Sequence, residues 1–153
     1  MLNPHYIVGF VDGEGCFCIS LNKNGKRLPE VRLLFEIELR EDDEPILREI
    51  QKVLGCGSIY RLEYERYAKW RSHVKLKVSN FTDISTKIIP FFTKYPLQAK
   101  KKKSFELFCK VAELLLQKHH LTTNGIEEIK LLKEDFIRDS LDAGNPHVQW
   151  GAE

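Results

Sequence analysis

Two acidic residues, Asp12 and Glu14, lie at the expected end of an apolar helical segment, residues 6–15. The C-terminal end of a helix carries partial negative charge, so an acid there loses about 0.3–1 kcal/mol unless a cation compensates it. A divalent metal ion is one such cation, and solvation at the surface is the ordinary alternative. Gly13 and Gly15 supply a permissive backbone with which the chain could leave the helix and turn sharply.

Four consecutive lysines, Lys100 to Lys103, precede an apolar-periodic segment, Phe105 to Leu116. Ser104 is the predicted N-cap of this helix. Cations are unfavourable beside a helix N-terminus, and neighbouring lysines also repel one another. A bound phosphate would relieve both effects, whereas a solvated lysine run is the common alternative. Acids, a metal ion and lysines together indicate phosphate chemistry.

Composition and length indicate one globular domain. The chain has 153 residues, of which 42% are hydrophobic and 30% charged, enough to bury a sizeable core. Neither a membrane-spanning run nor a secretory signal pattern is present. We therefore expect no membrane partner, no secretion, and a cytoplasmic or organellar interior that is reducing.

The four cysteines show neither a CxxC pair nor a histidine at zinc-finger spacing. We expect them to be reduced packing residues. Cys16 and Cys18 would share one face of a strand, where a zinc site would need two more ligands. No small-molecule cofactor is expected.

Hydropathy periodicity predicts an α+β domain in the order helix, hairpin, helix, hairpin, helix, followed by further C-terminal helices. The first hairpin turns at Asn24-Gly25, and the helix after it has Asp42 or Asp43 as its cap. Thr122 is the expected cap of the last helix. The predicted strands cover residues 16–23, 31–40, 57–66 and 69–78. After the first helix, one helix is predicted between the first hairpin and Gly55. Further helices are predicted near residues 82–92, 104–118 and 122–140.

Charge is segregated along the chain, although the net charge is only +2. An acidic block runs from Glu36 to Glu44 and a basic block from Arg61 to Lys77. Strand alternation directs Arg71, His73, Lys75 and Lys77 outward, which predicts a basic outer face of the sheet. A two-stranded ribbon fits the DNA major groove. The alternative is an ordinary α+β domain with one solvated sheet face.

Residues 9–15, Gly-Phe-Val-Asp-Gly-Glu-Gly, resemble the signature motif of the LAGLIDADG homing endonucleases. The resemblance continues through residues 35–43, the turn at 54–57, the lysine run and residues 121–129, so it spans roughly residues 5–140. It implies the αββαββα LAGLIDADG endonuclease fold with an antiparallel DNA-binding sheet. We expect one such domain over residues 1–141, with extra C-terminal helices, and a C-terminal tail over 142–153.

The resemblance also implies an activity, a partner and a cofactor. Only one signature motif occurs, and single-motif members act as homodimers; Tyr6, Gly9, Phe10 and Gly13 are the expected interface residues. The implied function is a site-specific double-strand DNA endonuclease, intron-encoded, acting on a long pseudo-palindromic target with Mg²⁺. Mn²⁺ is expected to substitute, and Ca²⁺ to bind without supporting cleavage. Two alternatives are an RNA maturase that assists intron splicing on the same fold and a DNA-binding regulator that has lost catalysis.

Particular residues match the family's catalytic positions. Glu14 matches the metal-ligating acid and the carbonyl of Gly13 a backbone ligand, whereas Asp12 ranks second. Lys101, and after it Lys103, match the basic residue near the active-site water. Some relatives carry a glutamine at the end of the second strand that helps to order water. This chain has Leu39 there, so either its neighbour Glu38 serves or water is organised differently.

The expected DNA contacts divide into phosphate contacts and base contacts. Lysines near strand ends and at the helix entrance should meet phosphates, whereas Arg32, Arg61, Arg71 and His73 should meet base edges. The full predicted set is Ser20, Asn22, Arg32, Glu36, Tyr60, Arg61, Arg66, Lys69, Arg71, His73, Lys75, Lys77, Lys100 and Lys102.

Overall fold

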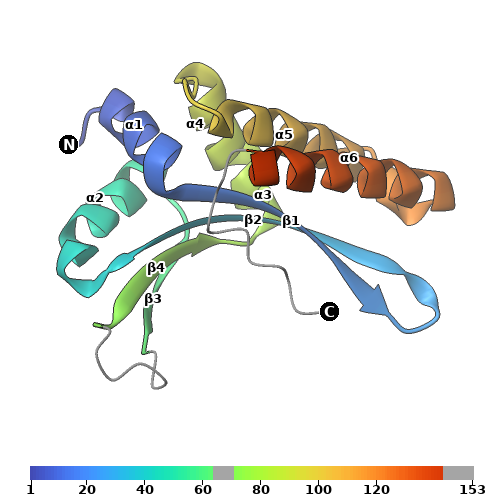
Figure 1. Ribbon diagram of the computed structural model, residues 1–153, viewed down its shortest axis with the longest axis horizontal. Helices are drawn as coiled ribbons and strands as arrows, with labels where there is room; N and C mark the ends of the chain where they lie inside the picture. Colours follow the sequence, from blue (N-terminus) through green and yellow to red (C-terminus); the bar gives the residue numbers. More distant parts are fainter. Residues whose placement is uncertain (64–70, 143–153) are drawn as a thin grey trace.

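The computed structural model describes residues 1–63 and 71–142 of the chain. Helices and strands follow the predicted order, which confirms the α+β fold class (Figure 1). The elements are α1 (Pro4–Glu14), β1 (Gly15–Asn24), β2 (Arg27–Arg40), the 3₁₀ helix η1 (Glu41–Asp43), α2 (Glu44–Leu54), β3 (Ser58–Leu62), β4 (His73–Val78), α3 (Phe81–Asp83), the π-helical segment η2 (Ile84–Ile88), α4 (Ile89–Lys94), α5 (Lys101–Leu116), the 3₁₀ helix η3 (His119–Leu121) and α6 (Thr123–Asp142).

The strands of the described ranges, four in number, form one antiparallel sheet in the order β1-β2-β4-β3. The long hairpin of β1 and β2 turns at Gly25, whose φ of 60° lies in the left-handed region that favours glycine. The register places Gly15 opposite Ile37 on β2, and Phe35 opposite Val78 on β4. β1 begins directly after α1, and this register places the start of β1 beside the end of β2.

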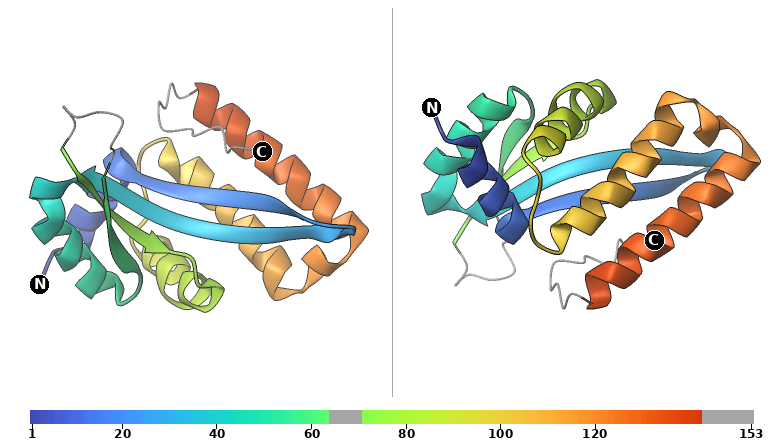
Figure 2. Two further views of the ribbon diagram at one scale, coloured as in Figure 1. Left: turned by 90° about the horizontal axis from the view of Figure 1, so that it is seen from below. Right: turned by 90° about the horizontal axis from the view of Figure 1, so that it is seen from above.

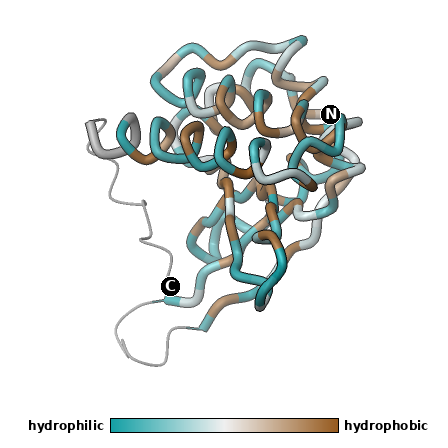
Figure 3. The backbone as a smooth tube through the Cα atoms, turned by 90° about the vertical axis from the view of Figure 1, so that its right-hand side faces the viewer, coloured by the Kyte–Doolittle hydropathy of each residue, from teal (hydrophilic) through white to brown (hydrophobic). Residues whose placement is uncertain are grey.

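In the described part of the chain, the helices cover one face of the sheet and leave the other without a helix. In Figure 2 the strands lie in front of the helices when the protein is seen from below, and α1, α5 and α6 lie in front when it is seen from above. Figure 3 shows hydrophobic residues on the helices and on the strands beneath them. We call the side without helices the outer face.

The core lies between the helices and the inner face of the sheet. Alternate strand residues point into it, as predicted, and Phe35, Ile37 and Leu76 are 0% exposed. Phe17 lies with its ring centroid 5.2 Å from those of Phe35 and Phe108. Burying each such ring contributes about 1.5–3 kcal/mol, so this aromatic group fixes how α5 rests on β1.

Three predicted caps have different outcomes. Thr122 caps α6, because its Oγ1 accepts a hydrogen bond from Gly125 N at 3.0 Å. The predicted cap of α2 is wrong in mechanism: Asp43 holds the N-cap position without a side-chain cap bond, and Asp42 binds Arg40 instead. The predicted Ser104 cap is also wrong, because α5 already begins at Lys101.

None of the helices in the described residues is long and apolar enough to cross a membrane.

Candidate active site and nucleic-acid interface

The acid-ended helix is present as predicted. Asn3 caps the start of α1 by accepting from His5 N at 2.8 Å, Pro4 occupies its first turn, and Ile7, Val8 and Val11 are buried. Glu14 is the last helical residue, and its side chain is exposed. Within the described residues it forms no side-chain hydrogen bond or ion pair, so its carboxylate is available to a ligand.

Gly15 is required for a reason other than the predicted one. Its φ of −79° is ordinary for any residue, so it needs no special backbone freedom. A Cβ atom at this position would lie 2.6 Å from Val11 Cγ1 and 3.0 Å from Val11 O. Glycine therefore allows β1 to start directly against the last turn of α1, which places Glu14 beside the sheet.

Asp12 has a structural role that sequence analysis missed. Its carboxylate accepts hydrogen bonds from the backbone N–H groups of Gln98, at 2.9 Å, and Ala99, at 3.2 Å. These bonds join α1 to the segment just before α5, across more than eighty residues of sequence. Asp12 thereby brings the lysine run to the C-terminal end of α1.

Lys101 lies at the centre of this junction. It is the first residue of α5, it is half-buried, and its Nζ donates a hydrogen bond to the carbonyl oxygen of Gly15. An ammonium group at this point compensates the partial negative charge at the end of α1. Lys100, Lys102 and Lys103 lie beside it, and their side chains are exposed. The predicted combination of acid and lysine is therefore assembled in space.

The described residues of one chain do not complete a metal site by themselves. In the described residues, no group of three or more His, Cys, Asp or Glu side chains could hold a metal ion. Glu14 and the neighbouring Gly13 carbonyl supply oxygen donors, the kind that Mg²⁺ prefers. Mg²⁺ needs about six ligands, so the remaining donors would have to come from phosphate, water or a second copy of Glu14.

The outer face carries mixed charge, which corrects the predicted basic face. Lys75 Nζ lies 3.5 Å from Glu36 Oε2 and 3.8 Å from Glu38 Oε1. Lys77 Nζ is 4.0 Å from Glu36 Oε1, and His73 Nδ1 is 3.5 Å from Glu38 Oε2. The antiparallel register of β2 and β4 places acidic and basic residues opposite each other, so the two predicted blocks neutralise each other here.

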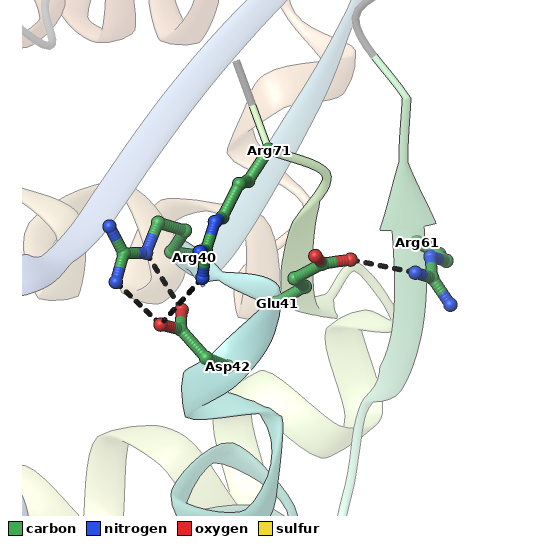
Figure 4. Close-up of polar contacts among 5 residues, drawn as sticks. All are labelled: Arg40, Glu41, Asp42, Arg61 and Arg71. Atoms are coloured by element: carbon green, nitrogen blue, oxygen red, sulfur yellow. Dashed lines mark hydrogen bonds and ion pairs between the residues drawn. The ribbon is translucent and has the colours of Figure 1, made fainter. Parts of the chain in front are cut away.

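A second charged group gathers where β2, β3 and the start of β4 meet (Figure 4). Arg40 donates to Asp42 through Nε at 2.8 Å, and Arg71 lies 3.6 Å from the same carboxylate. Arg61 donates to Glu41 at 2.7 Å. The hydrogen bond from Arg40 lowers the pKa of Asp42 to about 2, and the charge of Arg71 adds to this effect. Arg71 precedes β4, so its predicted place in the middle of a strand is wrong.

The other predicted residues have varied positions. Leu39 is 8% exposed and belongs to the core, so it has no part on the outer face. Glu38 lies on that face. It follows Ile37, which pairs with Gly15 at the start of β1, so Glu38 is near the end of α1. Ser20 bonds to Asn22 at 3.2 Å, Arg32 bonds to Glu30 at 3.1 Å, Tyr60 is 49% exposed, and Arg66 and Lys69 lie outside the described residues.

The cysteines are all free thiols, as expected. Cys16 and Cys18 do share one face of β1, with their Sγ atoms 3.0 Å apart. This contact lowers the pKa of Cys16, and together with burial it raises the pKa of Cys18. Burial raises the pKa of Cys109 to about 11 and also raises that of Cys56.

Comparisons with known proteins agree with this geometry. A family model described as LAGLIDADG endonuclease matches residues 7–112. "Probable intron-encoded endonuclease 3" of Neurospora crassa is 34% identical over 132 residues, which make up 86% of this chain and 24% of that protein. "Probable intron-encoded endonuclease Cox1-I1b" of Schizosaccharomyces pombe is 33% identical over 141 residues, 86% of this chain and 33% of that protein. The chain thus spans about a quarter to a third of these relatives' lengths.

Solved structures extend the similarity to three dimensions. The meganuclease I-SmaMI bound to uncleaveable DNA matches with a TM-score of 0.78 and 32% identity, covering 87% of this chain and 44% of that one. I-SmaMI bound to an uncleaved DNA target in the presence of calcium ions matches with a TM-score of 0.78 and 33% identity, covering 86% and 44%. I-GzeII in complex with its DNA target gives 0.76 and 33%, covering 88% and 43%. The predicted fold is therefore confirmed.

Proposed function

Because the chain belongs to the LAGLIDADG endonuclease family, we propose that it acts as a site-specific, intron-homing DNA endonuclease. It would hydrolyse one phosphodiester bond in each strand of a long pseudo-palindromic target. The observation that carries this proposal is the junction of an unpaired Glu14, at the end of α1, with Lys101 at the start of α5. A protein that only bound DNA would have no need for an acid beside a lysine at this point.

The residues at this junction fit a hard divalent cation. Glu14 and the Gly13 carbonyl would hold Mg²⁺, with Mn²⁺ as a substitute and Ca²⁺ as an ion that binds without supporting cleavage. When bound, Mg²⁺ supplies Lewis-acid stabilisation of phosphate charge and activates water. The solved I-SmaMI complex with uncleaved DNA and calcium ions supports divalent-ion use in a similar protein.

Lys101 and Glu38 have separate roles in this proposal. The Lys101 ammonium, held against the Gly15 carbonyl, adds fixed positive charge where the phosphate becomes more negative during hydrolysis. Lys103 stands two residues further along the same helix turn. Glu38 lies near the end of α1 on the outer face and would accept a hydrogen bond from water, the role for which Leu39 is too deeply buried.

A second copy of the chain would complete the site. The matched I-SmaMI and I-GzeII chains are more than twice as long as the part this chain covers, since it spans 43–44% of them. On α1, Gly9 and Gly13 have nothing within 4 Å of the place where a Cβ would stand, and Tyr6 is 49% exposed. With Phe10 partly buried beside Tyr6, this side of α1 would pack against its symmetry copy and bring two Glu14 residues together.

The uncovered outer face would lie along the DNA. Its strands carry Ser20, Asn22 and Arg32 on the long hairpin, and Tyr60 beside Lys75 on the short one. Side chains in the middle of such a ribbon reach base edges in the major groove, whereas Lys100 and Lys102 at the start of α5 would meet phosphates.

Replacement of Glu14 by glutamine tests the proposal. Glu14→Gln should abolish cleavage of a plasmid carrying the uninterrupted host gene in Mg²⁺, yet still shift the target DNA in Ca²⁺. Glu134→Gln, an exposed substitution on α6, is the matched control and should cleave normally. If Glu14→Gln cuts at the unaltered rate, the assignment of the metal site is wrong.

A further inference from the structure

Two thiols lie side by side on the outer face of β1, directly after the end of α1. The Sγ atoms of Cys16 and Cys18 are 3.0 Å apart, both side chains are partly exposed, and neither is in a disulfide. None of the roles proposed above uses them. We propose that Cys16 and Cys18 form a redox-modification site that closes to an intrachain disulfide, with a peroxide as the oxidant.

Strand geometry makes this disulfide a reversible one. Residues two apart in a strand have Cα atoms about 6.4–6.8 Å apart, and disulfides span about 4.4–6.8 Å between Cα atoms. The Cα separation therefore lies at the long end of the permitted range. The Cβ atoms of residues two apart on one strand face are about as far apart as the Cα atoms, and a disulfide needs about 3.5–4.5 Å between them, so closing the bond requires β1 to bend locally. Strained disulfides are more easily reduced than relaxed ones, so a dithiol reductant would reopen the bond.

The chemistry balances with hydrogen peroxide as the only co-reactant. One sulfur attacks a peroxide oxygen, the O–O bond breaks, and a sulfenic acid forms as one water leaves. The second sulfur then attacks the sulfenic sulfur, so that the S–S bond forms and the S–O bond breaks. The departing hydroxide takes the second thiol's proton as water. The two thiols together lose two electrons and two protons.

The residue between the two cysteines cannot move easily. Phe17 is 1% exposed. Its ring centroid lies 5.2 Å from those of Phe35 and Phe108, 5.3 Å from that of Phe105 and 5.6 Å from that of Phe92. Closing the disulfide draws the outer side of β1 together around this fixed point. The displacement must therefore appear in the neighbouring residues of the strand.

On one side those neighbours are the residues of the proposed active site. Gly15 separates Cys16 from Glu14, and its carbonyl accepts the hydrogen bond from Lys101. Oxidation should therefore shift Glu14 and Lys101 relative to each other. This functional consequence rests on the proposed endonuclease activity, whereas formation of the disulfide does not.

A thiol measurement tests the site itself. In a Cys56→Ser/Cys109→Ser protein, only Cys16 and Cys18 remain. After treatment with hydrogen peroxide we expect both thiols of each chain to be lost, with an intact mass lower by two hydrogens, and both to return with dithiothreitol. Retention of both free thiols, or linkage between chains on a non-reducing gel, would overturn the proposal.

A cleavage measurement tests the consequence. A misplacement of about 1 Å can cost about a hundredfold in rate, so the oxidised protein should cleave target DNA at least ~10-fold more slowly and recover on reduction. A Cys16→Ser/Cys18→Ser protein should keep its rate in peroxide, and loss of its rate there would overturn the assignment to this pair. If the reduced protein does not cleave at all, the endonuclease proposal fails, and the mass measurement still decides on the thiol pair.

Discussion

Replacement of Asp12 by alanine should destabilise the protein. Replacement of Glu14, an acid only two residues away, should not. The Asp12 carboxylate accepts two backbone hydrogen bonds, from Gln98 N at 2.9 Å and Ala99 N at 3.2 Å. Hydrogen bonds to charged groups contribute about 1.5–3 kcal/mol each when well shielded. Asp12 is partly exposed, and the freed N–H groups can bind water, so we expect a total loss of about 1–3 kcal/mol.

Thermal unfolding provides the assay. For a domain of this size, 1 kcal/mol shifts Tm by about 2–4 °C, so Asp12→Ala should lower Tm by about 2–12 °C. Asp12→Asn keeps one oxygen acceptor and should fall between alanine and the original residue. Because Asp12 holds the segment that carries Lys101, its replacement should also slow DNA cleavage.

Glu14 supplies the matched control. Its side chain is exposed and makes no contact to lose within the described residues, and its charge opposes the dipole of α1. Glu14→Gln should leave the free energy of unfolding unchanged or raise it by about 0.3–1 kcal/mol at low salt. If Asp12→Ala is as stable as the unaltered protein, or if Glu14→Gln is markedly destabilised, the assignment of a structural role to Asp12 and a ligand-binding role to Glu14 is refuted.

Three further outcomes are expected. In binding across a library of single-base target variants, Lys102→Ala at the start of α5 should weaken every variant and reduce the salt slope by about one, whereas Arg32→Ala should cost about 1–3 kcal/mol at one position. Equal weakening of every variant by both substitutions would contradict this. Asp42 has its pKa lowered to about 2, so its pair with Arg40 stabilises the fold above the unfolded pKa and is lost as pH falls from about 4 towards 2. Unfolding of Asp42→Asn against pH should therefore converge on the unaltered protein in acid. Gly9→Leu should leave the single chain folded, since a Cβ there meets nothing within 4 Å, but should abolish a dimer in sedimentation velocity.

Local patterns in the sequence predict most of the fold. Alternation of apolar residues identifies β1 and β2, because one face of each strand must be buried. The helix α2 ends at Gly55, as predicted, where φ is 72°. Similarly, the apolar spacing of Ile126 and Ile129 marks the buried side of α6, and both are at most 2% exposed. These features depend on neighbours within a few residues, so they are visible in the chain itself.

Features that depend on distant contacts were not predictable in this way. The prediction placed the start of α5 after a Ser104 cap, but the helix begins at Lys101. Asp12 fixes the backbone of Gln98 and Ala99 just before this point, and that contact is not visible from the local sequence. Local signals alone favour a serine cap over a lysine run at the first turn. In the folded protein α1 and α5 meet, and Lys101 lies at the negative C-terminal end of α1. A lysine that is unfavourable at the N-terminus of its own helix is therefore favourable here, because it compensates the dipole of α1.

The charge of the outer face has a similar origin and a functional consequence. Alternation directs Glu36 and Glu38 outward as clearly as Lys75 and Lys77, but only the register of β2 against β4 shows that they pair. Lysines already held by carboxylates add little net attraction for phosphate, because DNA must displace their partners. Carboxylates, in contrast, accept hydrogen bonds from cytosine N4. On the proposed function, the middle of the sheet therefore contributes base selection, while attraction for the DNA backbone comes mainly from the lysine run at the start of α5.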